Sequence, residues 1–115
     1  MISREHRFAG RASLKFVYKN GKVVRGPHFS VRYALNGRRA SYRAAVVVSR
    51  KISKSAVKRN RIRRRIYALI GSLEKQISQP YDIVITVFSE SVDSLTPPAL
   101  EKQLQQQLKA AGILR

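Results

Sequence analysis

The residues with the clearest chemical potential are the lysines and arginines between positions 50 and 65. Nine of these sixteen residues are cationic, and the chain has no acidic residue between Glu5 and Glu74. Cationic groups this close together repel one another and destabilise the compact state unless a polyanion neutralises them. The run therefore predicts a surface that binds phosphate groups, and nucleic acid is the first polyanion that it indicates.

The charge is unevenly distributed along the chain. Residues 1–73 hold twenty basic residues and one acidic residue, a net charge of +19, whereas residues 74–115 hold four basic and five acidic residues, a net charge of −1. This asymmetry favours a folded protein with one basic face and one ordinary face. With 115 residues, of which 43% are hydrophobic, the chain can bury a core, and we expect one domain over residues 1–115 that binds nucleic acid.

Several function classes are excluded or disfavoured by composition. Cysteine is absent, which excludes disulfides, thiolate metal sites and cysteine nucleophiles. The apolar runs are too short to span a bilayer, and residues 1–6 contain no apolar signal segment, so we expect a cytoplasmic protein with no membrane partner. The six carboxylates are scattered and His6 and His28 are the only imidazoles, so no catalytic residue and no protein metal site is expected.

The first half of the chain predicts one helix and two strands. Helical spacing of apolar residues predicts a helix over Arg11–Asn20, and alternation predicts a half-buried strand over Phe29–Leu35. Asn36-Gly37 is a turn signal and leads to a second strand over residues 42–49. We expect these two strands to form an antiparallel pair.

The second half predicts a long basic helix, a strand and a final helix. Isoleucines and leucines repeat at helical spacing over residues 55–77, Pro80 ends that helix, and residues 81–88 form a buried strand. Thr96 is the expected N-cap of the last helix and Gly112 its C-terminal cap. The order of elements predicts an α+β fold with helices packed on a small sheet.

The position of the cations on the long helix follows from its 100° rotation per residue. Arg61, Arg63 and Arg64 fall outside the apolar stripe, whereas Lys58 and Arg59 share its side. These two charges cannot lie in an apolar core, so the helix is expected to extend past the sheet and hold them at the sheet edge.

Two segments together resemble the signature of a known family. Val-Val-Val-Ser-Arg-Lys-Ile at 46–52 and Ala-Val-Lys-Arg-Asn-Arg-Ile-Arg-Arg at 56–64 resemble the bacterial ribonuclease P protein subunit, for which Arg-Asn-Arg on a basic helix is characteristic. Arg7-Phe8, the helix before Gly21-Lys22, and the strand that begins at Tyr81 follow in the order that the family uses. The resemblance covers nearly the whole chain.

This resemblance implies a fold and an activity. The fold would be an α/β sandwich similar to the second domain of ribosomal protein S5, with a small mixed sheet and a left-handed crossover around the basic helix, against the general rule. The protein would be one subunit of an endoribonuclease that removes the 5′ leader of precursor tRNA by phosphodiester hydrolysis. Its partners would be the ribonuclease P RNA and precursor tRNA, with no protein partner, and the RNA would carry the catalysis with magnesium ions held mainly by RNA.

The resemblance also implies roles for particular residues. A cleft between the first helix and the sheet would bind the single-stranded leader, with Phe29 and Tyr33 assigned to its sheet side by alternation. This chain departs from the family at Leu14, where an aromatic residue is common, and at Ser89-Glu90, where basic residues are common. The leader-binding residues would be Leu14, Tyr18, Phe29, Tyr33, Ser49, Arg50 and Lys51. The residues that bind the catalytic RNA would be Lys54, Lys58, Arg59, Asn60, Arg61, Arg63, Arg64 and Arg65.

Three other functions fit a small basic chain. A ribosomal or other structured-RNA-binding protein would bind RNA stably without any effect on tRNA maturation. A DNA-binding module would place the arginine helix in a major groove and prefer duplex DNA. A self-sufficient nuclease would depend on protein carboxylates whose replacement abolishes cleavage.

Overall fold

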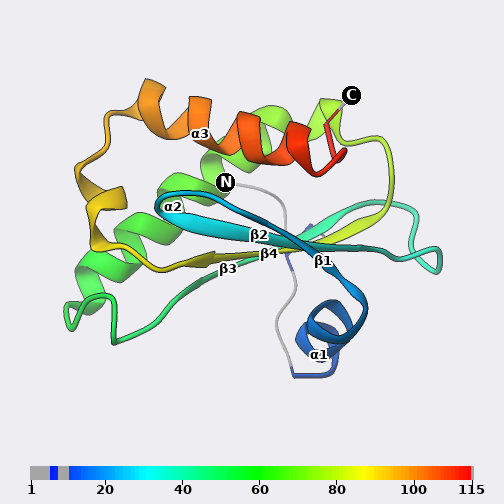
Figure 1. Cartoon of the computed structure of the whole chain (residues 1–115), viewed down its shortest axis with the longest axis horizontal. Coiled ribbons are helices and arrows are strands. Elements are labelled where there is room, and N and C mark those ends of the chain that lie inside the picture. Colours follow the sequence, from blue (N-terminus) through cyan, green and yellow to red (C-terminus); the bar gives the residue numbers. More distant parts are fainter. Residues whose placement is uncertain (1–5, 8–10, 115) are drawn as a thin grey trace.

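The protein has three layers, with a sheet between helices on both of its faces (Figure 1). The computed structural model describes residues 6–7 and 11–114, so Phe8 and residues 1–5, on which sequence expectations were placed, lie outside the described residues. Helices α2 and α3 cover one face of the sheet and α1 lies on the other (Figure 1). The elements are α1 (Arg11–Asn20), β1 (Lys22–Arg25), β2 (Phe29–Leu35), β3 (Arg43–Val48), α2 (Ala56–Leu73), η2 (Glu74–Gln76), β4 (Tyr81–Val87), η3 (Glu90–Ser94) and α3 (Pro97–Ala110).

The strands are ordered β1-β2-β4-β3. Strand β4 is antiparallel to β2 and parallel to β3, so the sheet is mixed, as expected. The prediction that β2 and β3 form an antiparallel pair is wrong, because β4 lies between them. Asn36 does not close a hairpin: its backbone N–H donates to Pro80 O at 3.0 Å, and its side chain donates to Asp82 Oδ2 at 2.9 Å. The chain after β2 therefore crosses the end of β4 to reach the far edge of the sheet.

The main core lies between the sheet and helices α2 and α3. Four residues of α2 at helical spacing, Ile62, Ile66, Ile70 and Leu73, are buried in it. Ser55 caps the helix, because its Oγ accepts from Lys58 N at 3.2 Å. The helix ends at Leu73 rather than at residue 77, and a 3₁₀ turn continues the chain.

Helix α3 begins and ends as the sequence predicts. Thr96 Oγ1 accepts from Ala99 N at 3.3 Å, and Gly112 has the positive φ of 77° that a C-terminal cap requires. The apolar side of the helix, formed by Leu100, Leu104 and Leu108, is buried in the main core.

A smaller core fixes α1 on the opposite face. Val17 is fully buried against Ala45 of β3 and Val84 of β4. Gly21 follows the helix where the backbone passes close to β2: a Cβ there would lie 2.4 Å from Val17 O and 2.8 Å from Tyr33 O. Only glycine fits this approach, and it brings α1 tightly onto the sheet.

Strand β1 was not expected from the sequence. It has four residues, three of them exposed, and it pairs with β2 along the sheet edge. The signal for it is weak, because two valines between Gly21 and Gly26 are too few to establish an alternating pattern.

A buried ion pair holds the end of β4 to β3. Asp82 is fully buried and accepts two hydrogen bonds from Arg43, with Nε to Oδ1 at 3.0 Å and Nη2 to Oδ2 at 2.8 Å. Bidentate contacts of this kind fix both position and orientation.

We expect Arg43→Leu to destabilise the protein by about 3–5 kcal/mol, because it leaves the Asp82 carboxylate buried without its cation. Urea denaturation followed by circular dichroism measures this loss. Arg38→Leu, at an exposed site in the turn between β2 and β3, is the matched control, and equal unfolding midpoints for the two variants would contradict the prediction.

Candidate nucleic-acid interface

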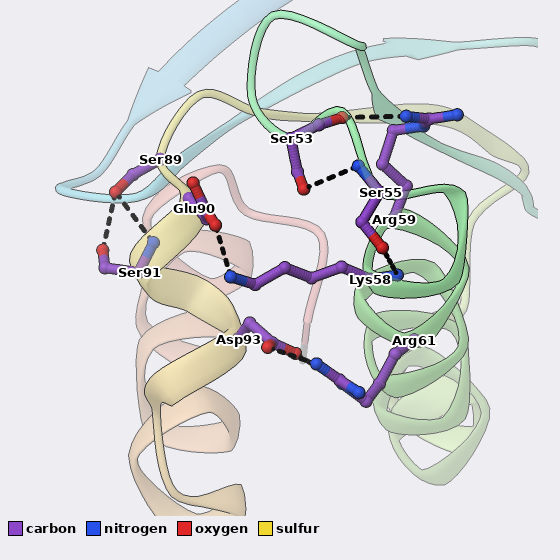
Figure 2. A network of polar contacts seen from close by, with 9 residues as sticks. All are labelled: Ser53, Ser55, Lys58, Arg59, Arg61, Ser89, Glu90, Ser91 and Asp93. Carbon is purple, nitrogen blue, oxygen red and sulfur yellow. Dashed lines mark hydrogen bonds and ion pairs between the residues drawn. The ribbon is translucent and has the colours of Figure 1, made fainter.

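The cations of α2 lie on two different sides of the helix. Lys58, Arg61 and Arg65 recur at i, i+3 and i+7. Lys58 and Arg61 face the 3₁₀ turn η3 (Figure 2), and Arg65 contacts the backbone of the same turn. We call these three residues the η3-facing stripe. Asn60, Arg63 and Arg64 lie on the side of the helix turned away from η3, and we call them the outer stripe.

The η3-facing stripe is held by partners within the protein. Arg61 donates from Nε to Asp93 Oδ1 at 2.7 Å and from Nη2 to Asp93 Oδ2 at 2.6 Å, and Lys58 Nζ pairs with Glu90 Oε1 (Figure 2). Arg65 Nη1 donates to the backbone oxygens of Val92 and Asp93, both at 3.1 Å, and Nη2 donates to Leu95 O. The sequence indicated no carboxylate to pair with these cations, and the structure provides two.

The ion pair between Arg61 and Asp93 changes the acidity of both groups. The hydrogen bonds from Arg61, followed by the charges of Arg61, Lys58 and Arg65, lower the pKa of Asp93 below its ordinary value. The same contact raises the pKa of Arg61. Because the pKa of Asp93 is lowered, its carboxylate is fully ionised at neutral pH, and the pair is lost only in acid, as the pH falls through that lowered value.

The outer stripe borders a surface hollow of about 430 Å³. Arg7 contributes to its wall with its guanidinium 5.8 Å from the centre of the Tyr67 ring, and Tyr67 is anchored because its hydroxyl accepts from Val46 N at 3.0 Å. Arg63 Nη2 donates to Asn60 Oδ1. The hollow thus combines three guanidinium groups with one aromatic ring, a composition suited to phosphates and bases. Its lining residues are Arg7, Val57, Asn60, Arg63, Arg64 and Tyr67.

The loop before α2 forms a second cationic hollow of about 640 Å³. Arg59 Nη1 donates to Ser53 O at 2.8 Å, and Ser53 Oγ accepts from Ser55 N at 3.3 Å (Figure 2). These bonds fix the loop against the start of the helix. Lys58 and Arg59 are only partly buried, so neither charge lies in the apolar core. The hollow is lined by Arg50, Lys51, Lys54, Ala56 and Arg59.

The face of the sheet beside α1 carries two pairs of a guanidinium group and an aromatic ring. Arg32 lies 5.0 Å from the centre of the Tyr18 ring, and Arg25 lies 5.0 Å from the centre of the Phe88 ring. Tyr18 is exposed, and Leu14, one turn earlier on α1, is partly buried against the small core of Val17, Ala45 and Val84. We call Tyr18, Arg25, Arg32 and Phe88 the α1 face.

The assignment of Phe29 and Tyr33 to the sheet side of the leader cleft is wrong. Phe29 is fully buried in the main core under α2 and α3, and Tyr33 packs against that core on the same side. Alternation along β2 was identified correctly, but the apolar side chains of a half-buried strand point to the larger core, which here lies under α2 and α3. The side chains between them, including Arg32, point to α1. The polar residues of the alternating pattern could therefore have identified Arg32 as a residue of the cleft.

The structure thus gathers most of the predicted residues into three areas. Leu14 and Tyr18 lie on α1 beside the sheet. Arg50, Lys51, Lys54 and Arg59 line the one hollow before α2, with Ser49 exposed at the start of the same loop, so residues predicted for the leader and for the catalytic RNA lie together there. The remaining predicted residues, Lys58, Asn60, Arg61, Arg63, Arg64 and Arg65, lie on the two stripes of α2. Sequence reasoning missed Arg7 and Tyr67, which approach the outer stripe from outside the basic run.

The described carboxylates do not fit a magnesium site. Among residues 6–7 and 11–114, no group of three or more histidine, aspartate or glutamate side chains is placed to hold a metal ion. Asp82, Glu90 and Asp93 are each paired with a basic residue, and Glu74 accepts a hydrogen bond from the Tyr42 hydroxyl at 2.7 Å. Burial and this bond to Glu74 raise the pKa of Tyr42, so its hydroxyl stays a donor. No step of a reaction is therefore assigned to a metal held by these residues.

The mixed sheet, the cationic helix and the α1 face define a class of protein, a small α+β protein with a surface suited to a polyanion. None of the helices in the described part of the chain combines the length and apolarity that a membrane crossing requires. The family model described as Ribonuclease P matches residues 2–112, and the chain belongs to this family, whose members are protein components of a ribonuclease holoenzyme.

Known relatives and solved structures agree with this family. The chain is 30% identical over 114 residues to the ribonuclease P protein component of Brevibacillus brevis, covering 99% of this chain and 89% of the relative. It is 35% identical over 99 residues to that of Synechocystis, covering 85% of this chain and 78% of the relative. The RNase P protein of Staphylococcus aureus superposes with a TM-score of 0.85 at 25% identity, covering 96% of this chain and 98% of that one. The Thermotoga maritima protein, at 23% identity and a TM-score of 0.80 over 90% and 96% of the chains, shares the fold.

Proposed function

We propose that this chain binds the ribonuclease P RNA and the 5′ leader of precursor tRNA, and so promotes magnesium-dependent removal of the leader by the holoenzyme. The observation that carries the proposal is the arrangement of guanidinium groups beside aromatic rings on two surfaces, the α1 face and the outer stripe. Membership of the family supports the choice of this RNA over other polyanions.

The two surfaces have different tasks in this proposal. The outer stripe and the loop before α2 present arginines and lysines, and the ring beside them, Tyr67, is partly buried and held through its hydroxyl by Val46 N. These two areas bind the phosphates of the catalytic RNA. The α1 face offers the exposed Tyr18 ring with the Arg32 guanidinium over it, and bases of a single strand stack on such a ring while a cation neutralises their phosphates. It therefore takes the leader.

The chain itself supplies binding rather than bond cleavage. Its described carboxylates are mostly engaged by basic or hydroxyl partners, and magnesium prefers to be held by phosphates and water with few protein groups. In the proposal the RNA therefore carries both the magnesium ions and the hydrolysis. The protein positions the substrate and reduces the repulsion between two RNA molecules.

We expect the protein to stimulate cleavage of a precursor tRNA by a bacterial ribonuclease P RNA at low magnesium, because its cations replace part of the ionic neutralisation. Gel analysis of the products measures the rate and the site of cleavage. Cleavage at the mature 5′ end that rises with added protein supports the proposal. Tight RNA binding with no stimulation would contradict it and favour a ribosomal or other structural RNA-binding role.

We expect Arg64→Glu to weaken binding to the ribonuclease P RNA and to reduce the dependence of log K on log salt by about one unit, as for any lost phosphate contact. Filter binding at several salt concentrations measures both quantities. Lys102→Glu makes the same charge change on the exposed side of α3 and is expected to leave the salt dependence unchanged. The assignment of the outer stripe fails if the two variants behave alike.

We expect Tyr18→Ala to weaken binding of precursor tRNA to the holoenzyme about tenfold, since stacking of one base on an aromatic ring contributes about 1–3 kcal/mol. Binding of mature tRNA, which has no leader, is expected to stay unchanged. Phe16→Ala is the matched control, because Phe16 is also partly exposed on α1 but points about 160° away from Tyr18 around the helix axis. Equal losses for precursor and mature tRNA would contradict a leader contact at Tyr18.

A further inference from the structure

The acidic residues of η3 occupy the side of α2 where an RNA backbone would otherwise find three cations. Asp93 binds Arg61 through both carboxylate oxygens, and Glu90 binds Lys58 (Figure 2). The partners are 32 residues apart in each case, so these are tertiary contacts between separate elements. We call Glu90 and Asp93 the acidic turn.

The contact resembles the way in which an arginine binds phosphate. A carboxylate presents two oxygens to the guanidinium fork in the geometry that a phosphate group also offers. Arg61 uses its Nε and one Nη for this contact, which is the edge that a phosphate would take. Asp93 is only 11% exposed, so its carboxylate sits between the helix and the rest of the turn rather than out in solvent.

The turn does not depend on its carboxylates for its position. Val92 is fully buried in the main core, and Arg65 donates to three backbone oxygens of the segment, those of Val92, Asp93 and Leu95. Removal of the two charges is therefore expected to leave η3 in place beside α2. Packing and the Arg65 hydrogen bonds hold the turn in place, and the two carboxylates neutralise the charges of Lys58 and Arg61.

We propose that Glu90 and Asp93 are an internal substitute for RNA phosphates, which removes Lys58 and Arg61 from the RNA-binding surface and limits that surface on α2 to the outer stripe. The inference rests on the proposed function to the extent that α2 faces RNA. It assigns to the acidic turn a role in specificity: the turn restricts which side of the basic helix an RNA can use.

The acidic turn affects the affinity of the protein for RNA that has no defined structure. Non-specific affinity grows with the number of counterions that the protein releases, and a cation already paired with a carboxylate releases none. The acidic turn therefore lowers affinity for arbitrary single strands. It leaves the outer stripe available to an RNA whose shape fits it, so the ratio of specific to non-specific binding rises.

The test uses the full chain with Glu90→Gln and Asp93→Asn together, and two probes: a random-sequence single-stranded RNA and a bacterial ribonuclease P RNA. Freeing two cations is expected to steepen the slope of log K against log salt for the random RNA by about 1.4, which corresponds to roughly tenfold tighter binding near 0.15 M salt. The gain for the ribonuclease P RNA is expected to be smaller. Weaker binding of the random RNA would overturn the proposal, because it would mean that Asp93 positions Arg61 for phosphate.

Glu101→Gln is a control for net charge, which it changes by +1 where the double variant changes it by +2. It removes one carboxylate from α3, where no ion pair is made by Glu101 among the described contacts, and it is expected to leave the salt slope unchanged. Equal slopes for this variant and the double variant would overturn the proposal, since the effect would then be one of net charge.

A second comparison does not need the double variant to fold. In the otherwise unchanged protein, Arg61→Gln is expected to leave the salt slope nearly unaltered, whereas Arg64→Gln is expected to reduce it by about 0.7 for a single strand. A reduction of the same size for Arg61→Gln would overturn the proposal. Binding of the random RNA tests the role of the acidic turn, whether or not the chain binds ribonuclease P RNA. If the proposed function fails, the protein does not bind ribonuclease P RNA, and this result is seen separately.

Discussion

The apolar stripe of α2 is the constraint on which the rest of the structure depends. A helix with this many cations gains nothing from packing unless one side of it is free of charge, and Ile62, Ile66, Ile70 and Leu73 supply such a side. Their burial against the sheet fixes the rotation of the helix. The direction of every arginine on it is then determined, including the division between the η3-facing stripe and the outer stripe.

The sheet lies between the basic helix α2 on one face and the α1 face on the other, and the loop after β3 connects the two sides. Its larger core lies under α2 and α3, and its other face holds α1 with only a small core around Val17. Because α1 buries so little, Tyr18 and Arg32 stay accessible beside it. The loop that starts at Ser49 joins β3 to the cationic helix and carries Arg50, Lys51 and Lys54, so in the proposed function the sheet connects the surface that binds the leader with the helix that binds the catalytic RNA.

Local patterns in the sequence predicted the elements better than their arrangement. The bounds of α1 and β2 and the caps of α3 follow from apolar spacing and from Thr96 and Gly112, which act within one helical turn. The order of strands depends on contacts such as that of Asn36 with Asp82, 46 residues away, and no local pattern carries that information. The turn signal at Asn36-Gly37 consequently suggested a hairpin that does not exist.

The candidate site was predicted only in part, because some of its contacts are also made between residues far apart in the sequence. The basic run identified α2 and the loop before it, because a cluster of lysines and arginines can be recognised in the sequence alone. The partners of Lys58 and Arg61 lie beyond β4, so their neutralisation could not be read from the neighbouring residues. On β2 the alternation of side chains was predicted correctly, but Phe29 and Tyr33 were assigned to the wrong face of the sheet. Which face is buried by which helices cannot be read from the strand itself.

The central place of β4 has a consequence for the order of events during synthesis. Strands β2 and β3 are both complete before residue 50, yet each pairs with β4, which begins at Tyr81. Until that strand leaves the ribosome, the nascent chain has most of its positive charge, but of its sheet only the pair of β1 and β2 can form. Folding therefore depends on contacts between distant parts of the sequence, which form more slowly than local contacts. During that interval the emerging chain exposes its cations without the sheet that later fixes their directions.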